Sequence, residues 1–159
     1  MAPTEVLIIS GGCHTPVHFT PISDILLSRG YTVSNLRLPS NSILPPPNSF
    51  QADIELVRGV AEQKAEGGQE IIVLMHSYGG FLGTEALVGL GVKERRKQGL
   101  PGGIKWLAYM AALVPFKGEK LDDTRRIRDD VPVLLRDTDH SVVVRLIGLP
   151  RDPWLGTRW

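Results

Sequence analysis

Apolar residues fall into two patterns that alternate along the chain. Continuous runs at residues 6–9 and 71–75, and further apolar stretches at 31–39 and 104–115, predict strands. Between them, at 19–29, 51–66 and 80–90, apolar residues recur every three or four positions, which predicts helices. This order of elements predicts an α/β fold, with a mainly parallel sheet and helices on both of its faces.

The composition changes near residue 118. Residues 1–118 carry the patterns just described and are expected to form one core domain. Residues 119–159 hold most of the arginines and two short apolar runs, at 131–135 and 142–147; we interpret them as a divergent segment, part of which could be disordered. Residues 45–47 are all proline and predict a loop, and the basic run at 93–97 is expected to be a solvated loop.

Charge and composition exclude several classes of function. The formal net charge is +1, from 18 basic and 17 acidic residues, so no field of one sign attracts nucleic acid or anionic lipid. No stretch approaches the roughly 20 apolar residues that span a bilayer, and the N-terminus lacks the basic residues of a signal peptide. The single cysteine, Cys13, excludes an internal disulfide. We therefore expect a cytoplasmic protein that binds neither membranes nor nucleic acid.

The segments that follow the strands carry the candidate chemistry. The stretches "SGGCH" (10–14), "LPSNS" (38–42), "HSYGG" (76–80) and "AALVP" (111–115) should meet at the carboxyl edge of a parallel sheet. Ser77 lies between a strand and a helix, where Gly79 and Gly80 relieve crowding. There it could attack a carbonyl, with the N–H of Tyr78 and one from the loop after the first strand holding the oxyanion. The competing interpretation is that Ser77 only caps the helix.

These stretches resemble a known superfamily. Residues 75–79, "MHSYG", are similar to the G-x-S-x-G nucleophile elbow of α/β-hydrolases, with Met75 in place of the first glycine. "SGGCH" looks like the oxyanion loop of the plant esterase and hydroxynitrile lyase branch, with Ser10 in place of its first histidine. "HFTPISDILLSRGYTV", "LRLPS" and "AALVPFKGE" also resemble that branch, so the likeness covers about residues 5–120. It implies that Ser77 is the nucleophile and that Gly12 and Tyr78 donate the oxyanion N–H groups.

The acid and base of the expected triad have two interpretations. In this superfamily they follow the serine in the order acid, histidine, and only His140 follows Ser77. In the interpretation we favour, 131–135 is the strand before the acid, Asp137 or Asp139, and the chain is an amino-terminal fragment that ends before its histidine. In the other, His140 is the base, and its partner is one of the preceding acids: Asp122, Asp123, Asp129 or Asp130.

The expected function is serine-dependent hydrolysis of a small ester or acyl substrate, without metal or organic cofactor. Cys13, His14 and His18 lack a fourth ligand for zinc. We interpret Cys13 as a small buried side chain and His14 as a packing or binding residue. The alternatives are a catalytically inactive fragment, a non-catalytic protein that binds a ligand or partner, and, by resemblance, a lyase acting on a cyanohydrin. An early end to the sheet would leave an edge through which a homodimer could form.

Overall fold

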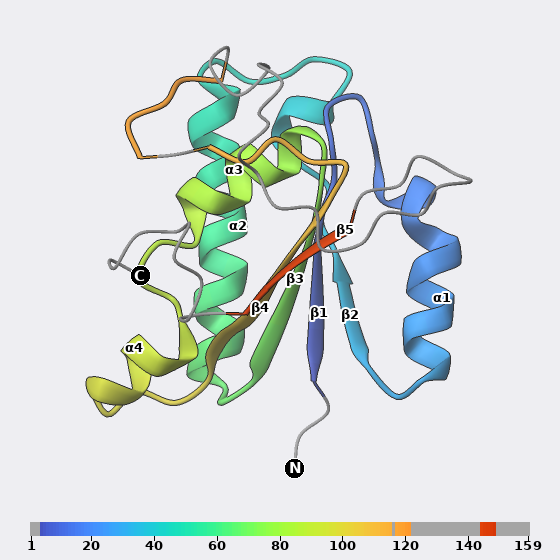
Figure 1. Ribbon diagram of the computed structural model, residues 1–159. Coiled ribbons are helices and arrows are strands. Elements are labelled where there is room, and N and C mark those ends of the chain that lie inside the picture. Colours follow the sequence, from blue (N-terminus) through green and yellow to red (C-terminus); the bar gives the residue numbers. More distant parts are fainter. Residues whose placement is uncertain (1–3, 116, 122–143, 149–159) are drawn as a thin grey trace.

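The computed structural model describes residues 4–115, 117–121 and 144–148, with a five-stranded sheet at its centre (Figure 1). The strand order is β2-β1-β3-β4-β5. The first four strands are parallel and the last runs antiparallel to β4, which confirms the prediction of a mainly parallel sheet. The strands are β1 (Glu5–Ile9), β2 (Thr32–Asn35), β3 (Glu70–His76), β4 (Gly103–Met110) and β5 (Val144–Gly148).

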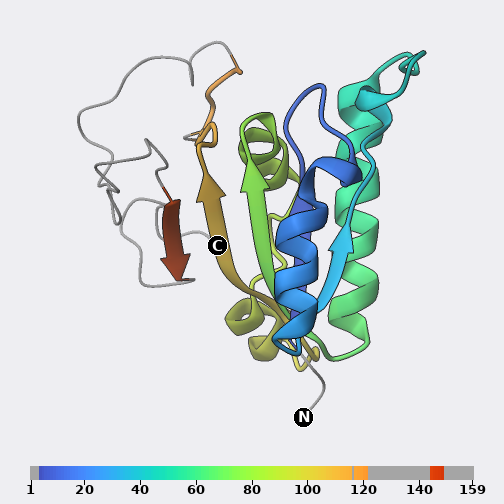
Figure 2. The ribbon, with the colours of Figure 1, turned by 90° about the vertical axis from the view of Figure 1, so that its right-hand side faces the viewer.

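Helices cover both faces of the sheet, as predicted. Helix α1 lies on one side, and α2, α3 and α4 lie on the other (Figure 1). Figure 2 looks onto the sheet with α1 in front of it. Two short 3-10 helices, η1 and η2, follow β1 and β2 and lead toward α1 and α2. The bounds are η1 (Pro16–Phe19), α1 (Thr20–Ser28), η2 (Pro39–Asn41), α2 (Ser49–Glu66), α3 (Tyr78–Ala86) and α4 (Val92–Lys97).

Strand β1, which lies between β2 and β3, has one layer of the core on each of its faces. Its side chains alternate between the faces, so Leu7 and Ile9 point toward α2 and α3, while Val6 and Ile8 point toward α1. All four are buried because the strand lies between two neighbours and under helices on each side. A continuous apolar run is the sequence signature of such a strand.

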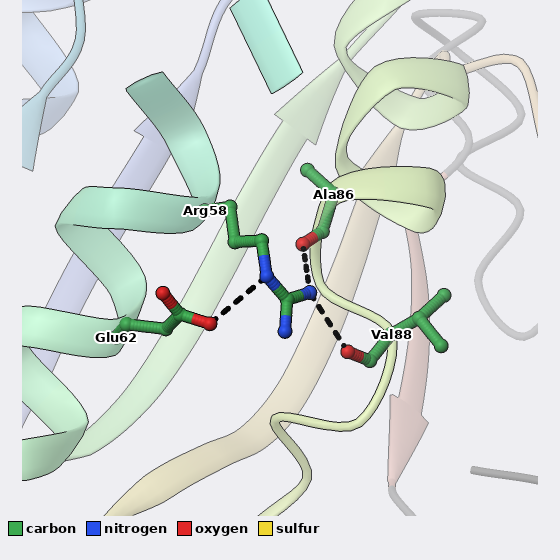
Figure 3. A network of polar contacts seen from close by, with 4 residues as sticks. All are labelled: Arg58, Glu62, Ala86 and Val88. Carbon is green, nitrogen blue, oxygen red and sulfur yellow. Dashed lines mark hydrogen bonds and ion pairs between the residues drawn. The ribbon is translucent and has the colours of Figure 1, made fainter. Parts of the chain in front are cut away.

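Arg58 of α2 fixes the end of α3 (Figure 3). Its Nη1 atom donates to the carbonyl oxygens of Ala86, at 3.1 Å, and Val88, at 3.0 Å. Its Nε atom pairs with Glu62 on the next turn of α2, at 2.9 Å. The last carbonyls of a helix have no partner within the helix, so this arginine both satisfies them and ties α2 to α3.

The prediction of a solvated loop at 93–97 was wrong, because these residues lie in α4. The helix follows Gly91, and Arg95 is buried within it. Its Nε atom donates to the carbonyl of Pro101 at 3.1 Å, so a side chain that looks solvated in the sequence folds back over its own connection. The predicted strand at 131–135 lies outside the described residues. None of the helices in the described part of the chain combines the length and apolar character that a bilayer crossing requires.

Candidate active site

Ser77 forms the whole connection between β3 and α3. Its backbone angles are φ 51° and ψ −121°, a conformation that residues other than glycine rarely adopt. Three backbone hydrogen bonds hold it: its N–H donates to Met110, and its carbonyl accepts from Gly80 and Leu113. The Ser77 hydroxyl makes no capping bond to α3, which contradicts the interpretation that this serine is only a helix cap.

The start of α3 is pressed against the neighbouring strand ends. A methyl group on Gly79 would lie 2.7 Å from the carbonyl oxygen of Ser10, and one on Gly80 would lie 2.8 Å from Cβ of Ala112. Neither position therefore has room for a larger side chain. The elbow, the loop after β1 and the segment after β4 meet at one edge of the sheet, as the sequence predicts.

Met75, which replaces the first glycine of the family motif, is fully buried beneath α3. A methyl group on Gly83 of α3 would lie 2.6 Å from the Met75 sulfur and 2.9 Å from Cδ1 of Ile9. The thioether therefore occupies space that a side chain at position 83 would need. The larger residue at position 75 is therefore accommodated by Gly83, which lies in the second turn of α3.

The loop after β1, residues 10–14, packs directly on the elbow. A methyl group on Gly11 would lie 2.9 Å from both Cβ of Ser77 and Nδ1 of His76. Neither the N–H of Gly12 nor that of Tyr78, the first residue of α3, has an acceptor among the described residues. Cys13 is exposed and has φ 62°, so the interpretation of a buried side chain was wrong.

Three histidines lie in or beside this loop. The ring of His14 lies 4.9 Å from that of His76 and 5.2 Å from that of His18, between centroids. Nδ1 of His14 donates to the carbonyl of Gly12 at 2.7 Å, since a carbonyl only accepts. Burial and the neighbouring His14 lower the pKa of His76, whose buried Nδ1 has no hydrogen-bond partner in the described part of the chain.

None of these histidines is hydrogen-bonded to the Ser77 hydroxyl within the described ranges. His14 packs against its aromatic neighbours, in agreement with its interpretation as a packing residue. No group of three or more histidine, cysteine or acidic side chains in the described residues is arranged to hold a metal ion. The expected acids and base lie outside the described residues: Asp122, Asp123, Asp129, Asp130, Asp137, Asp139 and His140.

The sequence analysis missed one buried acid beside the elbow. Asp53 of α2 is fully buried, accepts the backbone N–H of Ser40 at 2.9 Å and accepts the Tyr78 hydroxyl at 3.2 Å. Burial, the charge of Asp53 and this hydrogen bond raise the pKa of Tyr78 above its usual range. A signal existed, because Asp53 precedes the buried Val57 and Ala61 by four and eight positions and so lies on the buried stripe of the helix.

Comparisons with known proteins agree with this architecture. The family model described as "Alpha/beta hydrolase family" matches residues 6–159. The chain is 29% identical to the alpha/beta hydrolase nvfD of Aspergillus novofumigatus, over 87% of this chain and 58% of that protein. It is also 29% identical to a probable hydrolase of a Phoma species, over 77% of this chain and 48% of that protein.

Two crystal structures of polyneuridine aldehyde esterase, one of them a mutant, share the fold. Their TM-scores are 0.58 for the mutant and 0.57 for the other, at 20% and 18% sequence identity. They cover 75% and 77% of this chain, and 44% and 45% of the esterase. The chain thus spans about half the length of the proteins that it matches. The resemblance noted in the sequence is confirmed, and the protein belongs to the alpha/beta hydrolase family.

Proposed function

We propose that Ser77 is the nucleophile of a serine hydrolase that cleaves an ester or related acyl bond of a small molecule. The observation that carries the proposal is the backbone of Ser77, held at φ 51° between β3 and α3 with the loop of Gly11 packed against it. A non-glycine residue keeps such angles only where the surrounding structure imposes them, and this strain is typical of functional positions.

In the proposed reaction the Ser77 hydroxyl attacks the substrate carbonyl while a base takes its proton. The N–H groups of Gly12 and Tyr78 donate to the oxygen that becomes negative, and the positive end of α3 adds to this stabilisation. The intermediate collapses with loss of the alcohol, which receives the proton from the base. Water then releases the acid from the acyl-serine by the same route.

The base is either His140 or a histidine that this sequence does not contain, as in the two interpretations given above. An ester is favoured over other acyl bonds because one structural neighbour is an esterase by name. An apolar substrate is favoured by three aromatic rings beside the elbow: the ring of Phe50 lies 6.5 Å from that of Tyr78 and 5.8 Å from that of Phe81.

A fluorophosphonate probe tests the proposal. We expect mass spectrometry of the labelled protein to find the phosphonyl group on Ser77, and Ser77→Ala to abolish labelling. Ser28→Ala, a serine at the far end of α1, is the matched control and should label as the wild type does. A folded wild-type protein that is not labelled would contradict the proposal for this chain and favour either a catalytically inactive fragment or a non-catalytic binding protein.

His140→Gln separates the two interpretations of the base. If His140 is the base, its replacement slows labelling by orders of magnitude, because an unassisted serine is a weak nucleophile at neutral pH. If labelling of Ser77 is unchanged, His140 is not the base. Circular dichroism of the variant checks that the fold is retained.

A further inference from the structure

The side chain of Asn41, in η2, is bonded to the loop at 10–14. Its Oδ1 atom accepts the backbone N–H of Cys13 at 2.9 Å. Its Nδ2 atom donates to the carbonyl of His14 at 2.7 Å and to that of Gly11 at 3.0 Å. One amide therefore uses its acceptor and its donors on a single loop, 27 to 30 residues away along the chain.

The loop needs such support because its own backbone provides little. Cys13 lies in the left-handed region, at φ 62°, and only one backbone bond within the loop is present, from His14 N–H to Gly11 at 3.3 Å. Gly12 is exposed, and a methyl group placed on it would contact nothing within 4 Å. Without the amide of Asn41, packing of Gly11 on Ser77 and the bond from His14 to Gly12 would be the main restraints on Gly12.

We propose that Asn41 is a positioning residue that holds the loop at 10–14 so that the N–H of Gly12 faces the carbonyl oxygen under attack. This inference rests on the proposed function, since it assigns a role within the same site. Asn41 does not touch the substrate; it acts through the residues on either side of Gly12, the carbonyl of Gly11 and the N–H of Cys13.

The same turn is also linked to the second N–H donor. Ser40, next to Asn41, donates its N–H to Asp53, and Asp53 accepts the hydroxyl of Tyr78. Consecutive residues of η2 thus hold the loop of Gly12 on one side and the side chain of Tyr78 on the other. One short turn is therefore bonded to the loop of one donor and, through Asp53, to the side chain of the residue that carries the other, and it contributes no atom to the reaction itself.

The first measurement follows the loop and does not depend on catalysis. In Asn41→Ala the N–H of Cys13 loses its acceptor, so its hydrogen exchange should accelerate by about tenfold or more in the 159-residue chain. Ser42→Ala, at the exposed neighbouring position, should leave this exchange rate unchanged. Asn41→Ser shortens the side chain but keeps it polar, and it replaces Asn41→Ala if that variant does not fold.

The second measurement follows the site. The rate constant of the bond-forming step between Ser77 and a fluorophosphonate should fall about 10- to 100-fold in Asn41→Ala, with little change in the concentration of probe at half saturation. A displaced oxyanion donor slows the bond-forming step but does not change how tightly the probe first binds. Ile104→Val, buried at the opposite end of the sheet, is the control for a small general loss of stability and should label normally.

The two measurements together decide the proposal. Faster exchange at Cys13 with slower labelling of Ser77 supports it. Unchanged exchange in Asn41→Ala overturns it, and so does faster exchange with an unchanged labelling rate, because the loop would then be free without consequence for the reaction. If wild-type Ser77 is not labelled at all, the proposed function fails, and the catalytic role of Asn41 fails with it even if the exchange result shows that Asn41 holds the loop.

Discussion

The tight approach of α3 to the end of β1 makes a quantitative prediction about two glycines that both lie in helices. In Gly59→Ala, on the exposed side of α2, the new methyl group meets nothing within 4 Å. Alanine is favoured over glycine within a helix, so we expect this variant to gain about 0.5–1 kcal/mol in the free energy of unfolding.

Gly79→Ala, in the first turn of α3, is expected to have the opposite sign. Its methyl group would lie 2.7 Å from the carbonyl oxygen of Ser10 and 3.0 Å from the carbonyl carbon of Ile9. These are backbone atoms at the end of β1, so they cannot move aside as a flexible side chain can. Overpacking of this kind costs about 1–3 kcal/mol, and we expect a net loss of about 2 kcal/mol.

Urea unfolding followed by circular dichroism measures both variants. A loss of about 2 kcal/mol lowers the midpoint by roughly 1 M for a protein of this size, whereas Gly59→Ala should raise it slightly. The two variants should therefore differ by about 3 kcal/mol, or roughly 100-fold in the folding equilibrium. A Gly79→Ala protein as stable as Gly59→Ala would refute the close packing of α3 on β1 and, with it, the placement of the elbow.

Three further predictions concern the residues around the site. His14→Ala should raise the pKa of His76 toward its ordinary value, because it removes a neighbouring positive charge and uncovers the ring; an unchanged pKa by NMR titration would contradict this. Since burial and His14 lower the pKa of His76, the unfolded chain takes up this proton first as the pH falls below 6.5. The free energy of unfolding should therefore decrease from about pH 7 to about pH 5, and the decrease should be smaller in His76→Phe; equal slopes in denaturant titrations would count against it. Arg58→Ala should lower the free energy of unfolding by about 1–2 kcal/mol, because it frees two helix-end carbonyls, while Glu62→Ala, which removes only a half-exposed ion pair, should cost less than about 0.5 kcal/mol.

The sheet and the elbow could be predicted because their signals are local. The apolar run before Ser77 identifies a buried strand, and Gly79 and Gly80 immediately after it indicate a tight entry into a helix. Each of these features lies within a few residues of the next. The parallel direction of the strands then follows from the helices that connect them.

The residues that support the site could not be found in this way. Asn41 acts on partners at least 27 residues away along the chain, and a polar residue in a loop has many equivalent interpretations before the loop is folded. Helix α4 was missed for another reason: it is short, has no apolar stripe, and its charged residues are equally typical of a solvated loop. Cys13 was assigned from the average behaviour of free cysteines, which carries no information about a left-handed turn on a surface loop.

The close packing of Met75 against Gly83 has a consequence for how such chains are recognised. The space between β3 and α3 is limited, so in this chain the large side chain at position 75 requires a small residue at position 83. A search that requires glycine two positions before the serine passes over a chain that, like this one, has a larger residue there. A pattern that requires a small residue either two positions before the serine or six positions after it would include this chain.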